Sequence, residues 1–277
     1  MGQDMAGGSG NITTAQSFNG AIAAEMLKGG KHPVSVILLE LAQLVLLVGG
    51  FWVMAQLMSF GGSTIRGDFL VYLVTGVFFF QVHVKAMGAA IKADSARAGA
   101  GTRGLPGRVA AAACATLFVQ AMAAVILLTL YHTAWEPISI HQPAGFAMSF
   151  LLAWGSGISI GLVLLAFRQR AKAVVTLIAQ TYSRANMLAS GQMFVANMLP
   201  AQLVEWFLWN PLFHIIDQAR GHAFLNYTPW YTNAVFPAVS TLCVAAAGIL
   251  LCAGLRIPAG GGLQAAASDG EQELSDL

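Results

Sequence analysis

Long apolar runs are the feature that most constrains this chain. A helix needs about 20 consecutive apolar residues to cross the hydrocarbon layer of a bilayer. Hydrophobic residues make up 57% of the chain and charged residues only 9%, which is too few to cover a water-soluble domain of 277 residues. The sequence therefore predicts an all-α integral membrane protein with six transmembrane helices. The six apolar stretches are Val34–Met58, Phe69–Met87, Val109–Leu130, Ala144–Phe167, Ala173–Met193 and Ala234–Leu255.

The basic residues predict how these helices are oriented, because loops that stay in the cytoplasm retain Lys and Arg. With the N-terminus inside, the outer side holds only Arg66 and Arg220. We therefore expect both termini in the cytoplasm. The basic residues determine topology and contact lipid headgroups, so the net charge of +2 does not indicate a nucleic-acid partner. The basic residues on the predicted cytoplasmic side are Lys28, Lys31, Lys85, Lys92, Arg97, Arg103, Arg108, Arg168, Arg170, Lys172 and Arg256.

Two terminal segments flank the predicted transmembrane domain of residues 34–256. Residues 1–33 form a cytoplasmic segment in which Phe18, Ile22 and Met26 are spaced to share one face of a helix. A short amphipathic helix of this kind lies in the membrane interface; a frayed leader is the alternative. Residues 257–277 are rich in Asp and Glu, and we expect a disordered cytoplasmic tail.

The segment 195–233 is too apolar for an ordinary loop and too often broken by proline to span a bilayer. Broken backbone at membrane depth is tolerated where protein covers it or where it lines a wet cavity. We therefore expect short re-entrant helices that enter from the outer side before the last span. Asn210 and Pro211 suit the N-cap and the first position of one such helix.

The run from Trp209 to Arg220 resembles the region before the last span of type-two permeases of ABC exporters, particularly those for capsular polysaccharide and O-antigen. The matching pattern is N-P-L-x-H-I-I-[DE]-x-x-R, in which the re-entrant motif residues are Asn210, Pro211, His214, Asp217 and Arg220. Ser190–Phe194 and Leu199–Pro200 precede it as in that family. The layout of nearly the whole chain is also similar to these permeases.

This resemblance implies a permease subunit of the bacterial inner membrane that moves a polysaccharide or a lipid-linked glycan. It implies a homodimer bound to two copies of a separate ATPase subunit, with membrane lipid around it. No G-x-x-x-x-G-K-[ST] motif occurs in the sequence, so ATP and Mg would bind to that partner, and this chain would have no cofactor and no enzymatic activity of its own. O-antigen, teichoic acid and other lipid or small-molecule cargoes remain alternatives.

The cytoplasmic loop 88–108 is where the resemblance implies coupling to the ATPase. Ile91, Lys92, Arg97 and Arg103 are the candidate coupling residues. The loop departs from the family pattern in being unusually rich in Gly and Ala.

Charged residues inside spans are functional candidates because hydrocarbon disfavours them. Arg184, beside Tyr182, is the leading candidate for contact with an anionic sugar or lipid phosphate, and an internal polar contact is its alternative. Lys85 is expected to extend to the cytoplasmic headgroups. Trp52 and Trp154 are weaker candidates for the walls of a sugar pathway. Other charged or small residues of interest are Glu40 in the first span and Gly157 and Gly161 in the fourth.

His214, Asp217 and Arg220 are spaced to share a helix face, and we expect a polar network that fixes the re-entrant helix against the sixth span, with Asp217 placed to pair with Arg220. A third ligand at fixed spacing is missing, so no metal site is predicted. Two other functional classes are less favoured. A secondary transporter calls for an internal repeat with paired broken helices, and a lipid-modifying enzyme calls for clustered catalytic groups; neither pattern occurs in the sequence.

Overall fold

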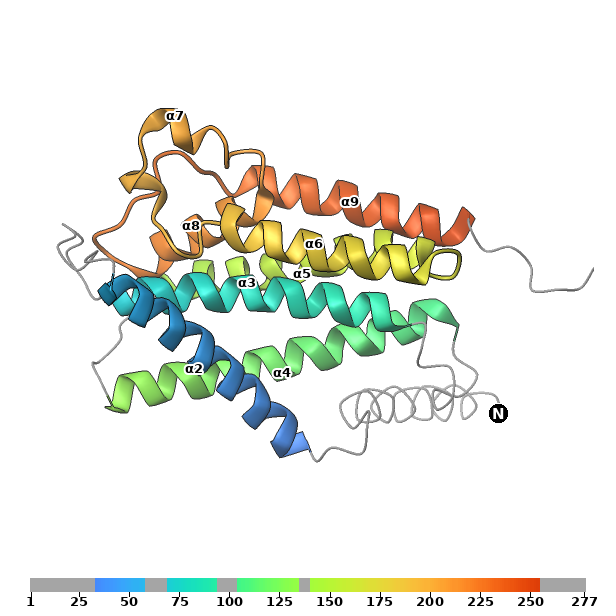
Figure 1. Ribbon diagram of the computed structural model, residues 1–277, viewed down its shortest axis with the longest axis horizontal. Coiled ribbons are helices and arrows are strands. Elements are labelled where there is room, and N and C mark those ends of the chain that lie inside the picture. The colour runs from blue at the N-terminus through green and yellow to red at the C-terminus, as the bar shows by residue number, and fades with distance from the viewer. Residues whose placement is uncertain (1–32, 58–68, 94–103, 135–139, 255–277) are drawn as a thin grey trace, which may run out of the picture.

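The computed structural model describes residues 33–57, 69–93, 104–134 and 140–254, and regular secondary structure in these ranges is entirely helical (Figure 1). The predicted interface helix with Phe18, Ile22 and Met26, the coupling candidates Arg97 and Arg103, and the acidic tail lie outside the described residues. The elements are α2 (Pro33–Leu57), α3 (Phe69–Lys92), α4 (Leu105–Ala134), α5 (Pro143–Arg168), α6 (Lys172–Ala189), the 3-10 helix η3 (Ala196–Met198), α7 (Ala201–Val204), α8 (Pro211–Ala223) and α9 (Val235–Gly254).

Four helices in the described part of the chain are long and apolar enough to cross a membrane, which confirms a helical fold of the membrane type. They are Tyr72–Lys92, Leu105–Thr133, Pro143–Arg168 and Val235–Gly254. The first and fifth predicted spans are also helical, as α2 and α6. In α2 the apolar helical stretch is the shorter Val34–Gly50, and α6 is lowered in hydropathy by Gln180, Arg184 and Asn186.

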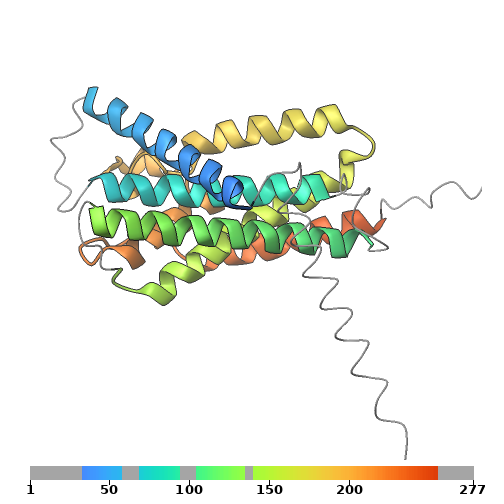
Figure 2. The same cartoon turned by 90° about the horizontal axis from the view of Figure 1, so that it is seen from below.

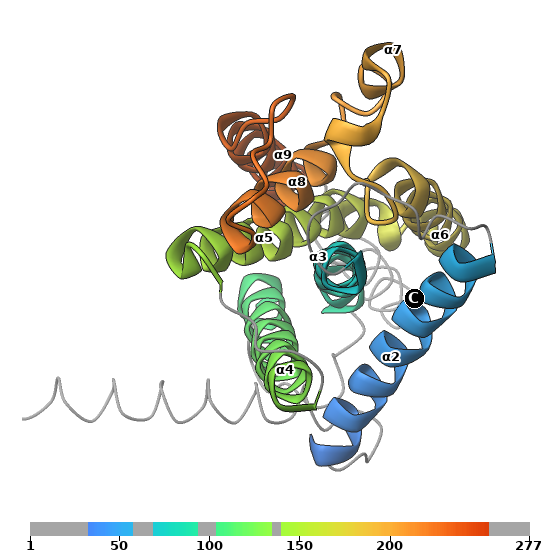
Figure 3. The same cartoon turned by 90° about the vertical axis from the view of Figure 1, so that its left-hand side faces the viewer.

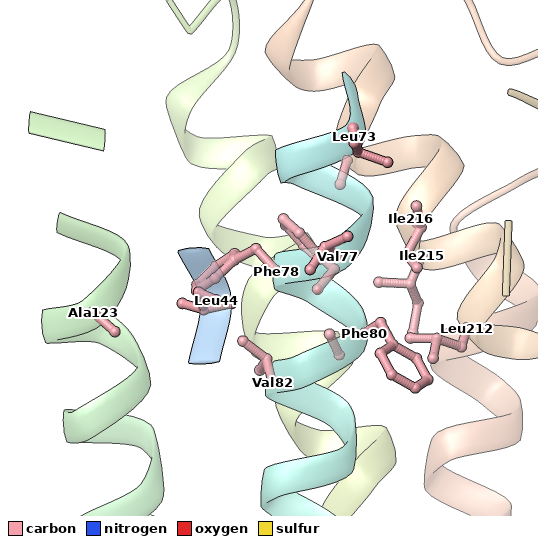
Figure 4. Packing of buried hydrophobic residues seen from close by; sticks show 13 residues of the cluster. Leu44, Leu73, Val77, Phe78, Phe80, Val82, Ala123, Leu212, Ile215 and Ile216 are labelled. Atoms are coloured by element: carbon pink, nitrogen blue, oxygen red, sulfur yellow. The ribbon is translucent and has the colours of Figure 1, made fainter. Parts of the chain in front are cut away.

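Helix α3 lies at the centre of the bundle, with α2, α4, α5, α6 and α8 around it (Figure 3). In an apolar 18-residue stretch of α3, 67% is buried inside the bundle. The corresponding share in α9 is only 11%. Phe78 and Phe79 of α3 pack against Phe150 and Phe146 of α5. The same core includes Leu212, Ile215 and Ile216 of α8 (Figure 4).

Glycines in α5 allow it to lie directly against α3. A Cβ atom at Gly161 would be 2.6 Å from Cβ of Ala90 and 2.7 Å from the carbonyl oxygen of Met87. Gly157 approaches the backbone of His83 in the same way. Gly157 and Gly161 therefore form the contact between α5 and α3 within the chain, because close helix contact requires small residues at the seam.

The segment after α6 is broken into short pieces, as the prolines predicted. It contains η3, α7 and α8, which lie at one end of the bundle, opposite the turn between α5 and α6 (Figure 1). Helix α8 begins at Pro211, and the side chain of Asn210 accepts a hydrogen bond from the amide of Leu212. This geometry confirms the predicted N-cap and first position of α8.

Candidate functional site

A cavity of about 730 Å³ lies between α2, α3, α4 and α6. It is lined at its base by Glu40, Lys85 and Gln120, and at the end of the bundle by Lys92 and Arg168. Figure 2 shows that α6 diverges from α3 toward the turn between α5 and α6. Lys92 and Arg168 lie at this end, because Arg168 ends α5 and donates to the carbonyl oxygen of Ile91 at the end of α3. Apolar lining comes from Val36, Val84, Met87, Ile91, Ala115, Val119 and Ala179. The cavity is therefore amphiphilic, with basic groups above an apolar wall.

Two charged residues from different helices neutralise each other at the base of this cavity. Nζ of Lys85 lies 2.8 Å from Oε2 of Glu40 and also donates to Oε1 of Gln43 at 2.6 Å. Gln120 of α4 donates to the other oxygen of Glu40 at 2.9 Å. The prediction that Lys85 extends to the headgroups is therefore wrong, because a carboxylate one helix away offers a partner inside the bundle. The pair joins α2 to α3 and α4.

Other basic residues in the cavity or close to it differ in their hydrogen bonds. Arg168 donates to the carbonyl oxygen of Ile91 at 2.6 Å, and Arg108 donates to that of Ala93 at 3.3 Å. Both place a cation at the C-terminal end of α3, where the helix dipole favours positive charge. Arg184 is exposed, and within the described residues it forms no hydrogen bond or ion pair. The Arg184 guanidinium is thus the basic group of the cavity that contributes least to stabilising the fold.

A buried chain of hydrogen bonds starts where α8 begins. Oδ1 of Asn210 accepts from the amide of Leu212, so its Nδ2 must be the donor toward the carbonyl oxygen of Ala189 at 2.9 Å and toward Oδ1 of Asn186 at 2.6 Å. Backbone groups therefore fix the orientation of both amides. In this orientation Nδ2 of Asn186 points toward the preceding turn of α6.

The chain continues through α3 to α5. Nδ2 of Asn186 donates to the hydroxyl of Tyr182 at 2.9 Å, so the Tyr182 proton is directed to Nε2 of His83, also at 2.9 Å. His83 then carries its proton on Nδ1 and donates to Oγ of Ser156 at 2.8 Å, and Ser156 donates to the carbonyl oxygen of Ala153. Every donor in this chain points the same way. It ties α6, which forms one wall of the cavity, to α3, α5 and α8.

Arg220 of α8 is buried, with 2% of its surface exposed, and it bonds to backbone rather than to a carboxylate. Its guanidinium donates to the carbonyl oxygens of Gly191, Phe194, Gln192 and Tyr72 at 2.7–3.3 Å. These bonds hold the turn after α6 and the start of α3 against α8. Such a fork of donors suits arginine because its guanidinium is planar and carries five N–H groups.

Asp217 is engaged elsewhere, so the predicted pairing of Asp217 with Arg220 is wrong. Its two carboxylate oxygens accept from the hydroxyl of Tyr227 and, at 2.7 Å, from that of Thr232. Burial, together with the nearby Asp217 charge, raises the pKa of Tyr227 above its usual value. Asp217 therefore fastens the loop before α9 onto α8.

His214 completes the attachment of α8 to α9. Its Nε2 donates to the carbonyl oxygen of Leu208 at 2.8 Å, and its Nδ1 accepts from the amide of Asn233 at 3.2 Å. The ring also packs on Phe236 in α9, with centroids 4.9 Å apart. The predicted network around the short helix thus exists, and it reaches the loops on both sides as well as the last long helix.

The predicted pathway residues do not lie together. Arg184 lines the cavity, whereas Tyr182 points inward to His83. Trp154 donates to the carbonyl oxygen of Ala113 and joins α5 to α4, and Trp52 is exposed near the end of α2. Of the coupling candidates inside the described ranges, Ile91 and Lys92 line the cavity at the end of α3.

Four uncharged polar residues of the site were not predicted from the sequence, because only charged residues stand out clearly in an apolar run. They are His83, Ser156, Asn186 and Gln120. Tyr182 and Asn186 are four residues apart, a spacing that places them on one helix face. A histidine inside an apolar run is as informative as a charge. These two signals together would have indicated a polar contact between the second and fifth predicted spans.

The described residues hold no group of three or more His, Cys, Asp or Glu side chains that is suited to a metal ion. Comparison of the chain with protein-family models and with curated proteins gave no match. We therefore infer its function from its own residues and geometry.

Proposed function

We propose that this chain is the permease subunit of an ATP-driven exporter that moves a polysaccharide or a lipid-linked glycan across a bacterial inner membrane. The observation that carries the proposal is the amphiphilic cavity between α2, α3, α4 and α6. Basic groups such as Arg184 suit an anionic sugar or phosphate, and the apolar wall suits the adjoining carbon chain or sugar ring. O-antigen, teichoic acid and other lipids would satisfy the same cavity.

The distribution of basic residues supports an orientation with this cavity toward the cytoplasm. Lys92, Arg108, Arg168 and Lys172 lie at or near the ends of α3, α4, α5 and α6, and most residues that line the cavity lie in the halves of the helices that carry these ends. In this orientation α2 and α6 join the four more apolar helices as spans, both termini are cytoplasmic, and α7 and α8 are re-entrant from the outer side.

Energy for transport would come from a separate ATPase, because the sequence has no phosphate-binding loop. The end of α3 is a suitable contact for such a partner. Its last carbonyls are held by Arg108 and Arg168, so Ile91 and Lys92 are presented on a braced helix end. We expect two permeases and two ATPase subunits in the complex.

Deletion of the gene in its host tests the proposal. Glycan is extracted from the cytoplasm and labelled at the surface, in the deletion strain and in strains complemented with wild type, Arg184→Gln or Arg170→Gln. Arg170 is exposed at the same end of the bundle and does not line the cavity, so it is a matched control. We expect intracellular polymer to accumulate on deletion, wild type and Arg170→Gln to restore export, and Arg184→Gln to restore it only in part.

An unchanged surface with no trapped glycan would contradict export of a polysaccharide. Purification of the tagged permease from its host provides the second test, since a co-purifying ATPase in equal amount is expected. A permease that transports its cargo without any ATPase would exclude the proposed energy source.

A further inference from the structure

The cavity between α2, α3, α4 and α6 is called the basic cavity below. A second cavity, of about 260 Å³, lies at the opposite end of the bundle. Its walls come from the start of α5, the end of α8 and the loop that follows α8. The lining residues are His141, Gln142, Gln218, Gly221, His222, Phe224, Leu225, Tyr227, Thr228 and Pro229. We refer to it as the outer cavity.

Backbone bonds and two glycines fix the shape of the outer cavity. The amide of Gln142 donates to the carbonyl oxygen of His222 at 2.8 Å, so the start of α5 runs beside the end of α8. A Cβ atom at Gly145 would be 2.5 Å from Nδ1 of His222, and one at Gly221 would be 2.7 Å from Cδ of Pro229. The absence of side chains at these glycines lets the His222 ring and Pro229 take their positions in the wall.

Polar side chains of the outer cavity retain hydrogen-bond donors and acceptors that can bind a ligand. Nδ1 of His222 lies 3.0 Å from Oε1 of Gln142, which leaves Nε2 of the neutral ring as an acceptor and the Gln142 amide as a donor. Gln218 uses its amide nitrogen on Thr232, so its carbonyl oxygen can accept. Thr228 adds a hydroxyl that both donates and accepts.

Among the described residues, the lining of the outer cavity contains no Lys, Arg, Asp or Glu, in contrast to that of the basic cavity, and its basic side chains are those of His141 and His222. Burial also lowers the pKa of His222 below its usual value, which favours the neutral imidazole. A ligand that matches these groups is itself uncharged and bears several hydroxyl groups.

An apolar surface and the size of the cavity narrow the ligand further. One face of the Phe224 ring is stacked on Tyr72 with centroids 4.1 Å apart, and Phe224 and Tyr227 both contribute to the wall. Aromatic rings of this kind pack against the C–H faces of a ligand. Pockets for drug-sized ligands measure roughly 300–1,000 Å³. The outer cavity, at about 260 Å³, lies just below this range and suits a ligand of one ring.

We propose that the outer cavity binds a single neutral, hydroxyl-rich ring, such as one hexose unit of a glycan. The identification of that ring as part of an exported polymer rests on the proposed function. The binding itself depends only on the residues of the outer cavity.

The test is saturation-transfer NMR on the purified full-length chain in lipid nanodiscs without ATPase, with the methyl glycosides of glucose, galactose, mannose and N-acetylglucosamine as probes. We expect ring-proton signals from at least one glycoside with wild type. Gln142→Ala should weaken binding about two- to tenfold, as expected for loss of one neutral hydrogen bond. Thr228→Trp should abolish binding by filling the cavity. Gln142 and Thr228 are exposed, so both variants should fold, which their elution from a sizing column checks.

Gln202→Ala is the matched control, because Gln202 is exposed on α7 and lines neither cavity. Absence of signal from all four glycosides would overturn the proposal, as would unchanged binding to folded Thr228→Trp. Loss of binding in Gln180→Ala, which alters the basic cavity instead, would also overturn it. These outcomes leave the gene-deletion result untouched, so failure of the outer cavity and failure of the export function are separable.

Discussion

Helices α5 and α6 pack against different sides of α3 in different ways. Helix α5 lies directly on α3 through Gly157 and Gly161, and aromatic rings of both helices interleave beside this seam. Helix α6 meets α3 mainly through the Tyr182–His83 hydrogen bond and a small cluster around Val175. The difference indicates a rigid half, made of α3, α5 and α8, and a more loosely held wall that borders the basic cavity.

Replacement of Arg220 should have the largest effect, because its guanidinium donates four hydrogen bonds that hold the start of α3 and the turn after α6 against α8. A hydrogen bond from a charged group contributes about 1.5–3 kcal/mol, so Arg220→Met is expected to prevent accumulation of folded protein. The measurement is the yield of monodisperse protein on a sizing column. The control is Arg170→Met on the exposed turn after α5. A normal yield of Arg220→Met would show that the rigid half does not depend on this residue.

The α3–α5 seam is tested by two identical substitutions in one helix. Gly161→Ala should lower stability by about 1–3 kcal/mol, because the new methyl group overlaps Ala90 and Met87. Gly155→Ala should be neutral or slightly stabilising, since its Cβ would meet only Thr241 at 3.8 Å and alanine favours a helix by roughly 1 kcal/mol. Thermal melting in detergent measures both. Equal melting temperatures would mean that the seam tolerates expansion.

The hydrogen-bond chain is the link between the two halves. Tyr182→Phe removes the partner of both Asn186 and His83, and we expect a loss of about 1–3 kcal/mol in the same melting assay. Tyr231→Phe changes an exposed ring in the loop before α9 and should leave the melting temperature as it is. If both variants melt alike, the hydrogen bonds of the Tyr182 hydroxyl do not contribute to stability.

Arg184→Gln should have the smallest effect on stability, within about 0.5 kcal/mol, because an exposed side chain is altered away from any bonded partner in the described residues. Under the proposed function, the export of glycan by this variant should nevertheless fall. A variant that melts at a lower temperature in proportion to its loss of export would assign Arg184 to the fold instead.

The sequence was sufficient to predict the helical membrane-type fold, since apolar runs and prolines determine helix positions almost without tertiary information. It also predicted the cap of α8 from Asn210 and Pro211. The partners of polar residues were harder to predict, because spacing describes one helix at a time. Asp217 and Arg220 share a helix face, yet Asp217 bonds to residues 10 and 15 positions later and Arg220 to carbonyls from two other segments.

The candidate site was predicted only in part for the same reason, because sequence spacing does not describe contacts between helices. Arg184 was identified because a charge in an apolar run stands out, and it does line the cavity. Lys85 was identified for the same reason, but its partner Glu40 lies 45 residues earlier on another helix. Only the packing of α2 beside α3 brings these two side chains together.

The single direction of the hydrogen-bond chain gives the protein a built-in spectroscopic reporter. Because backbone groups at Ala189 and Leu212 dictate the Asn210 and Asn186 orientations, His83 is held in one neutral tautomer with its proton on Nδ1. The two ring nitrogens of that tautomer have well-separated ¹⁵N resonances. A displacement of α6 from α3 would free Nε2 and let the second tautomer form, so the imidazole spectrum of one residue would record motion of the cavity wall.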